Sequence, residues 1–312
     1  MPELDQQHLA NRIVELRADD REFAEAAPSA AVAEAMRQAD GDLVATMTAA
    51  LTGYADRPAL AQRASELVNT GGRSRLELLP RYESLSYREL WQRMRGLANG
   101  WLDAGLAADD FVATVGFTSV DYATVDLTCM LLGAVAVPLP ITSSARQLAP
   151  IMDETRPRIL ATDISSIAIA VQLALDADCV ERLVVFDYDE RADDQREAFQ
   201  AAADKLPERV TLRSLSAELV RGQQLPDRLR SKGDPERLAS LIYTSGSTGS
   251  PKGAIYTEAM LTQLWQRSRA GMTNAGASGD LPLPTIVLHY MPMSHVNGRS
   301  WLVSALASGG IG

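Results

Sequence analysis

Apolar and polar positions alternate in blocks through the middle of the chain. Short runs rich in Val, Ile and Leu predict buried strands. The segments between them carry apolar residues at three- and four-residue steps, which is typical of helices. Strands that alternate with helices indicate a parallel sheet covered on both faces, and hence an α/β fold. The predicted strands are 111–116, 134–139, 158–162, 182–187 and 238–244, and the helices between them are 120–132, 143–155 and 164–177.

The clearest single helix is SLSYRELWQRMRGLANGWLDAG, residues 84–105. Its apolar residues recur on one face, Ser86 with Glu89 matches a capping box, and Gly105 suits the end of a helix. The apolar face includes Tyr87 and Trp101. We interpret this aromatic stripe as core packing and not as a platform for a ligand.

Two other regions look peripheral. Residues 1–50 are charged, rich in alanine and helical in pattern, with a break at Pro28 and a second helix predicted over 30–37. We interpret them as a helical N-terminal extension without chemistry of its own. Residues 188–237 are polar and contain runs of charge, which indicates a solvated connecting surface.

The composition narrows the classes of function. The 312 residues carry a formal net charge of −10, and the isoelectric point is about 4.9. A broad nucleic-acid interface needs a basic face, so this class is excluded. A small anionic ligand is still compatible with an acidic chain, because a local loop can bind it.

The first twenty residues contain no apolar core, so they do not resemble a signal peptide. The longest apolar run, residues 129–141, is shorter than the ~20 residues that a membrane span requires. We therefore expect a cytoplasmic protein. Cys129 and Cys179 are interpreted as buried reduced thiols in preference to a redox pair, and the three histidines are too scattered to suggest a metal site.

The stretch LIYTSGSTGSPKGAIYTE, residues 241–258, joins an apolar strand to a loop of small, hydroxyl-bearing residues. The loop 245–253 leaves the carboxyl end of the strand, where ligands of α/β sheets lie, and a helix with Thr257 as its N-cap is predicted to follow. Glycines let backbone N–H groups approach a phosphate closely, hydroxyls add donors, and a lysine adds a point charge. The residues concerned are Thr244, Ser245, Gly246, Ser247, Thr248, Gly249 and Lys252.

Three better-known loops are excluded by their spacing. A Walker A loop has Gly directly before its Lys, where this chain has Pro251. The dinucleotide fingerprint G-x-G-x-x-G and the hydrolase elbow G-x-S-x-G do not fit residues 246–249 either. On the residues alone, a phosphate-binding loop and a plain surface turn both stay open.

Residues 241–252 resemble the phosphate-loop signature of the adenylate-forming superfamily, to which acyl-CoA synthetases, peptide-synthetase adenylation domains, luciferases and carboxylic acid reductases belong. Further segments agree with that family in their order along the chain. The charged N-terminal extension and the HVNGR segment are most similar to carboxylic acid reductases. The segments that carry the resemblance are ADRPAL (55–60), LSYRELW (85–91), GAVAVPL (133–139) and MPMSHVNGR (291–299).

The resemblance implies a reaction. The family activates a carboxylic acid with ATP, giving an acyl-adenylate and pyrophosphate, with Mg²⁺ shared among the phosphates. In the reductases the acyl group then passes to a phosphopantetheine thiol of a carrier domain. A separate reductase domain reduces the thioester to an aldehyde with NADPH.

The resemblance also implies roles for individual residues. Thr244 to Gly249 and Lys252 would bind the β- and γ-phosphates and the leaving pyrophosphate. His295 would contact the substrate carboxylate or the adenylate phosphate, and Gly298 would allow the substrate to approach closely. Arg299 would support the site. His289 is expected to be structural, inside a strand predicted over residues 284–293 that ends at Pro292.

The family's later motifs, which bind adenine and ribose and supply a catalytic lysine, have no match before residue 312. We therefore expect residues 51–312 to form an incomplete adenylation domain with little or no adenylation activity of its own. Two alternatives remain: an acyl- or aryl-CoA ligase, which shares the first half-reaction, and a non-catalytic nucleotide-binding fragment.

Overall fold

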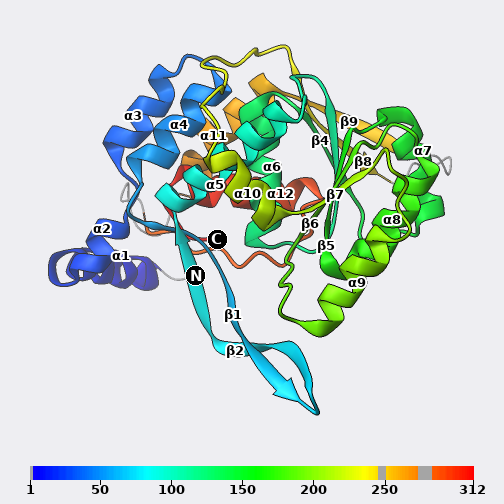
Figure 1. Ribbon diagram of the computed structural model, residues 1–312. Coiled ribbons are helices and arrows are strands. Elements are labelled where there is room, and N and C mark those ends of the chain that lie inside the picture. Colours follow the sequence, from blue (N-terminus) through cyan, green and yellow to red (C-terminus); the bar gives the residue numbers. More distant parts are fainter. Residues whose placement is uncertain (1–2, 245–250, 273–282) are drawn as a thin grey trace.

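The computed structural model describes residues 3–244, 251–272 and 283–312 (Figure 1). Its centre is a seven-stranded sheet with the strand order β7-β6-β5-β3-β4-β8-β9. All neighbours in this sheet are parallel except β8 and β9, which form an antiparallel pair. The strands are β3 (Phe111–Val115), β4 (Val135–Leu139), β5 (Ile159–Asp163), β6 (Arg182–Phe186), β7 (Thr211–Ser214), β8 (Leu238–Thr244) and β9 (Lys252–Thr257).

The inner strands are apolar on both faces because helices cover both. Successive side chains of a strand point to opposite sides of the sheet. Accordingly, Val112 belongs to one hydrophobic cluster and Ala113 to the other, and Ala161 and Leu160 divide in the same way. The five strands predicted from short apolar runs are all present, so the predicted α/β fold with a mostly parallel sheet is confirmed.

The helices lie in two layers, visible on either side of the sheet in Figure 1. Three of them cover one face: α7 (Ala145–Thr155), α8 (Ile167–Asp176) and α9 (Asp193–Ala203). The other face is covered by a thicker layer made of α3 (Ala30–Gln38), α4 (Leu43–Gly53), α5 (Tyr87–Asp103), α6 (Val120–Leu132), α10 (Leu215–Gln223), α11 (Glu258–Met272) and α12 (Val296–Ala307).

Helix α5 begins and packs as its sequence predicts. The Ser86 side chain accepts the Glu89 amide at 3.2 Å, and the Glu89 carboxylate accepts the Ser86 amide at 2.8 Å, which completes the capping box. Tyr87, Met94 and Trp101 are completely buried on the apolar face. The aromatic stripe is therefore part of the core.

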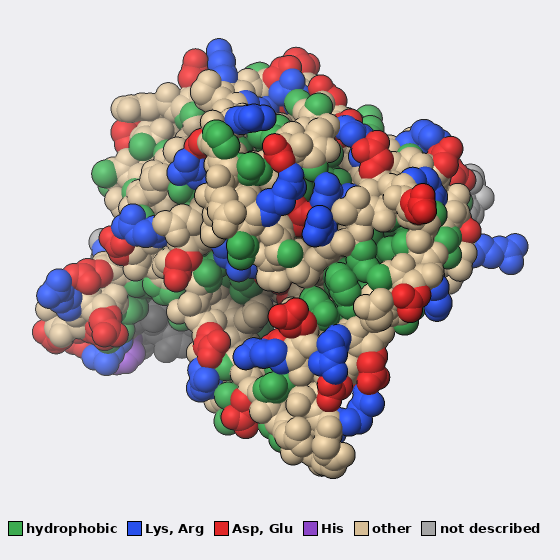
Figure 2. All heavy atoms as spheres, viewed as in Figure 1, with side chains coloured by type: hydrophobic (Ala, Val, Ile, Leu, Met, Phe, Trp, Pro, Cys, Tyr) green, Lys and Arg blue, Asp and Glu red, His purple; other side chains and the backbone are tan. Residues whose placement is uncertain are grey.

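Two features project from this body. Helices α1 (Glu3–Asp19) and α2 (Arg21–Ala26) extend on one side, and a long antiparallel hairpin of β1 (Pro58–Thr70) and β2 (Arg73–Ser86) extends below (Figure 1). Positive and negative side chains are interspersed over the face in Figure 2, including this hairpin. The division of the chain at residue 50 stays a prediction. Among the described residues, no helix combines the length and apolar character that a membrane span requires.

Several local predictions were wrong. Residues 284–293 do not form the expected strand, because their backbone finds a neighbour only at the isolated bridge between Ile286 and Ile311. The polar region 188–237 is more than connecting surface, since it contributes α9, the edge strand β7 and α10. Lys252 and Gly253 belong to β9 and not to a loop. The β1–β2 hairpin is an addition to the predicted elements, because its mostly polar residues do not form the short apolar runs that predict strands.

The two cysteines are both free, as predicted, but they differ in exposure. Cys129 is completely buried in α6, whereas Cys179 is only partly buried. The prediction of two buried thiols therefore holds for Cys129 alone.

Candidate functional site

The β8–β9 hairpin positions the two described ends of the predicted phosphate loop. Thr244, the last residue of β8, pairs directly with Lys252, the first residue of β9. Both side chains are exposed. Since β8 runs parallel to β4, the pair lies at the carboxyl edge of the sheet, where ligands of α/β proteins lie. The residues between them, Ser245, Gly246, Ser247, Thr248 and Gly249, lie outside the described part, so their predicted role stays a prediction.

Lys252 has a charge that is available to a ligand. Within the part of the chain that the structure describes, no carboxylate forms an ion pair with it. An unpaired ammonium beside a threonine hydroxyl is suited to an anion such as a phosphate. The arrangement of Thr244 and Lys252 at the two ends of the loop is therefore compatible with the predicted binding of phosphate.

His295 marks the beginning of helix α12. Its backbone is extended, and its Nδ1 accepts the amide of Asn297 at 3.1 Å, so the imidazole acts as the N-cap. This contact assigns the ring proton of the neutral imidazole to Nε2, because Nδ1 is the acceptor. The side chain is exposed, and within residues 3–244, 251–272 and 283–312 no hydrogen bond occupies its Nε2.

Gly298 is needed for the packing of the first turn of α12. A Cβ at this position would lie 2.4 Å from the carbonyl oxygen of Pro292 and 2.9 Å from that of Met291. The close approach that glycine permits in this structure is therefore to the chain's own backbone. Its predicted contact with substrate stays a prediction.

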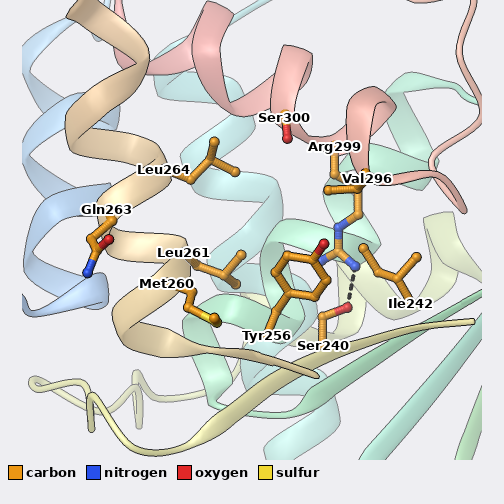
Figure 3. A pocket seen from close by; sticks show the side chains of 10 residues that line it. All are labelled: Ser240, Ile242, Tyr256, Met260, Leu261, Gln263, Leu264, Val296, Arg299 and Ser300. Carbon is orange, nitrogen blue, oxygen red and sulfur yellow. Dashed lines mark hydrogen bonds between the residues drawn. The ribbon is translucent and has the colours of Figure 1, made fainter. Parts of the chain in front are cut away.

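A mainly apolar pocket of about 260 Å³ joins the hairpin to α12 (Figure 3). In Figure 3 the Arg299 side chain extends from α12 to Ser240 on β8, with Tyr256 of β9 beside it. The helix turn that carries His295 thus lies next to the hairpin that carries Thr244 and Lys252. The pocket is lined by Ser240, Ile242, Tyr256, Met260, Leu261, Gln263, Leu264, Val296, Arg299 and Ser300.

Arg299 is buried together with a carboxylate. Its Nη2 lies 3.0 Å from Oδ1 of Asp126 on α6, and each residue is 3% exposed. Burial raises the pKa of Asp126, and the neighbouring guanidinium opposes this effect. The sequence had suggested a supporting role for Arg299 but not its partner. The available signal is Asp126 itself, a charged residue in the middle of a mostly apolar helix, away from the first turn that Asp121 occupies.

His289 is half-buried, and neither ring nitrogen has a hydrogen-bond partner among the described residues. Burial lowers its pKa, which favours the neutral imidazole. It lines a second, largely apolar cavity of about 530 Å³, together with Leu60 and Met293. The strand expected around it is missing, and its structural role stays a prediction.

The fold and the hairpin site agree with a known family. Residues 48–311 match the AMP-binding enzyme family, and the chain belongs to it. Among solved structures, it superposes on the adenylation domain of the carboxylate reductase of Mycobacterium chelonae with a TM-score of 0.90 and 36% identity, covering 100% of this chain and 48% of that one. It also matches the corresponding domain from Segniliparus rugosus, solved with AMP and a co-purified carboxylic acid, with a TM-score of 0.88, 38% identity and coverage of 97% and 49%.

The sequence relatives agree with this grouping. The carboxylic acid reductase of Mycobacterium tuberculosis is 41% identical over 310 residues, which cover 98% of this chain and 26% of the relative. The chain is thus similar over nearly its whole length to the adenylation part of carboxylic acid reductases. It spans about a quarter of the length of the curated relatives that it matches.

Proposed function

We propose that this chain takes part in the ATP-dependent activation of a carboxylic acid to an acyl-adenylate, with release of pyrophosphate, as the first step of the reduction of that acid to an aldehyde. The observation that carries the proposal is the antiparallel pairing of Thr244 with Lys252 at the carboxyl edge of the sheet. Membership of the AMP-binding family and similarity to carboxylic acid reductases support it.

Attack of a carboxylate on the α-phosphate places negative charge on the departing pyrophosphate. Donors that are already aimed at those oxygens lower the barrier, because they need no reorganisation during the reaction. Lys252 and the hydroxyl of Thr244 would supply part of this stabilisation, and residues 245–249 would supply backbone and hydroxyl donors. Mg²⁺ would be bound through the phosphates of ATP and would neutralise charge there.

His295 would hold the carboxylate of the acid or the phosphate of the adenylate through Nε2. Its N-cap contact with Asn297 leaves that nitrogen as a donor. Gly298 would serve the same turn by letting it pack against the carbonyls of Met291 and Pro292, and so would hold His295 towards the substrate. The proposal extends to the full-length protein. It would contain a carrier domain with a phosphopantetheine thiol and a reductase domain that uses NADPH, and it would be located in the cytoplasm.

Binding of ATP tests the proposal directly. We expect titration calorimetry with Mg²⁺ and ATP to detect binding to the chain, and Lys252→Ala to weaken it by about tenfold or more, since an ammonium–phosphate contact is lost. Lys205→Ala is the matched control, because Lys205 is an exposed lysine in the turn that follows α9. Added salt should reduce the difference between wild type and Lys252→Ala.

Two results would contradict the proposal. One is an absence of ATP binding to the wild-type chain at millimolar nucleotide. The other is an equal loss of affinity in the Lys252 and Lys205 variants, which would indicate a general charge effect and no specific phosphate contact.

A further inference from the structure

Arg299 joins three elements from a buried position at the wall of the pocket in Figure 3. One of its nitrogens pairs with Asp126 on α6 at 3.0 Å, and another donates to the Ser240 hydroxyl on β8. The Ser240 hydroxyl in turn donates to the carbonyl of Ala136 on β4 at 2.9 Å. Arg299 and Asp126 are 3% exposed, and Ser240 is 1% exposed. The guanidinium thus connects α12 to α6 and to two neighbouring strands of the sheet.

Stability alone explains such a contact poorly. Removing two charges from water is costly, and replacing a buried ion pair by apolar side chains of similar size is often neutral or stabilising. Among the described residues, the Asp126 Oδ2 atom has no hydrogen-bond partner, and Arg299 Nη2 is in ion-pair contact with Oδ1 without forming a hydrogen bond. An ion pair that adds little stability but has a specific geometry is better suited to fixing the relative positions of α12, α6 and β8 than to stabilising the fold.

The elements that it fixes are those of the candidate site. The backbone amide of Arg299 donates to the carbonyl of His295 at 3.4 Å, so both belong to the first turn of α12. Ser240 and Thr244 belong to the same strand, β8, which leads to Lys252 across the hairpin. A displacement of the guanidinium would therefore move His295 relative to the Thr244–Lys252 pair.

We propose that Arg299, held by Asp126 and Ser240, is a positioning residue that fixes the His295 turn against the phosphate-binding hairpin. The predicted effect on nucleotide binding rests on the proposed function. The predicted effect on the geometry of His295 is independent of that function, because it can be measured without any ligand.

Long-range proton–nitrogen correlation NMR of the imidazoles is the first measurement. At alkaline pH, where imidazoles are neutral, wild-type His295 should show the Nε2–H tautomer, because Nδ1 accepts the Asn297 amide. A His295→Gln variant identifies its signals. In Arg299→Met we expect His295 to become a mixture of tautomers, while His8 and His289 keep their wild-type signals.

A double variant separates positioning from stability. Asp126→Leu combined with Arg299→Met replaces the ion pair by two apolar side chains. Its thermal midpoint should return to the wild-type value or above it, whereas Arg299→Met alone leaves a buried carboxylate unpaired and lowers the midpoint. We expect the His295 tautomer to remain mixed in both variants. We also expect ATP affinity to be lower by about tenfold in both, as measured by calorimetry.

The matched control is the ion pair of the partly buried Arg182 with the buried Glu218, which links the beginning of β6 to α10. Arg182→Met combined with Glu218→Leu should leave both the His295 tautomer and ATP affinity unchanged. If the Asp126–Arg299 double variant keeps the Nε2–H tautomer and wild-type ATP affinity, Arg299 is structural only and the inference is overturned. If the wild-type chain does not bind ATP, the proposed function fails, and the His295 tautomer still decides the inference.

Discussion

Asp187 provides a stability switch that can be worked out from the structure. It follows β6 with a left-handed backbone, φ 50°, and its amide donates to the Asp121 carboxylate at 3.1 Å. Burial raises the pKa of Asp187 from its ordinary 3.8 to about 7, and repulsion from Asp121 and Asp163 adds to this effect. Hydrogen bonding from Ser119 and attraction by Arg93 oppose it only in part.

The direction of the pH dependence follows from linkage. The folded chain holds the Asp187 proton more tightly than the unfolded chain, so this group favours folding most strongly below pH 3.8, and the benefit is lost as pH rises to about 7. Each tenfold difference in proton affinity is worth about 1.4 kcal/mol. The difference between 3.8 and about 7 therefore corresponds to a loss of about 4 kcal/mol as an upper bound.

The substitution Asp187→Asn tests this, because asparagine has no ionisable carboxyl group and tolerates a left-handed backbone. We expect this variant to exceed wild type in free energy of unfolding by about 2–4 kcal/mol above pH 7, and the difference to shrink steadily towards pH 4. Urea unfolding followed by tryptophan fluorescence at several pH values measures it. The matched control is Asp40→Asn, because Asp40 also has a left-handed backbone, φ 48°, but is exposed.

The reasoning would be refuted by parallel pH profiles for wild type and Asp187→Asn. Other carboxylates titrate in both proteins, so only the difference between the two profiles reports on Asp187. An equal change in Asp40→Asn would assign the effect to backbone preference and not to the buried charge.

Two further predictions concern the body of the fold. Ser86→Ala should lower the free energy of unfolding by about 1 kcal/mol, because the Glu89 amide loses its cap, and the urea midpoint should shift without a change in slope. A urea midpoint equal to that of wild type would show that water replaces the Ser86 cap without a loss of stability. In Cys179→Ser, the remaining thiol of Cys129 should react with Ellman's reagent only on unfolding, since burial raises its pKa and blocks access; fast reaction of the native variant would contradict this.

Part of this protein could be predicted from local pattern alone. The inner strands β3 to β6 and β8 are short apolar runs, and α5 carries its own cap and its own apolar stripe, so each element is specified by residues close together in the sequence. The stretch from Thr244 to Lys252 predicts a phosphate-binding site because its glycines, hydroxyls and lysine are contiguous. Such signals need no knowledge of distant neighbours.

Other features depend on partners that are remote in the sequence. The polar strands β1, β2 and β7 are strands because another segment pairs with them, and residues 284–293 lack that pairing despite an apolar pattern. The same holds for the site. Only the folded chain places Lys252 opposite Thr244 and brings Asp126 to Arg299, since pairing register and charge burial are decided by contacts that no local pattern contains.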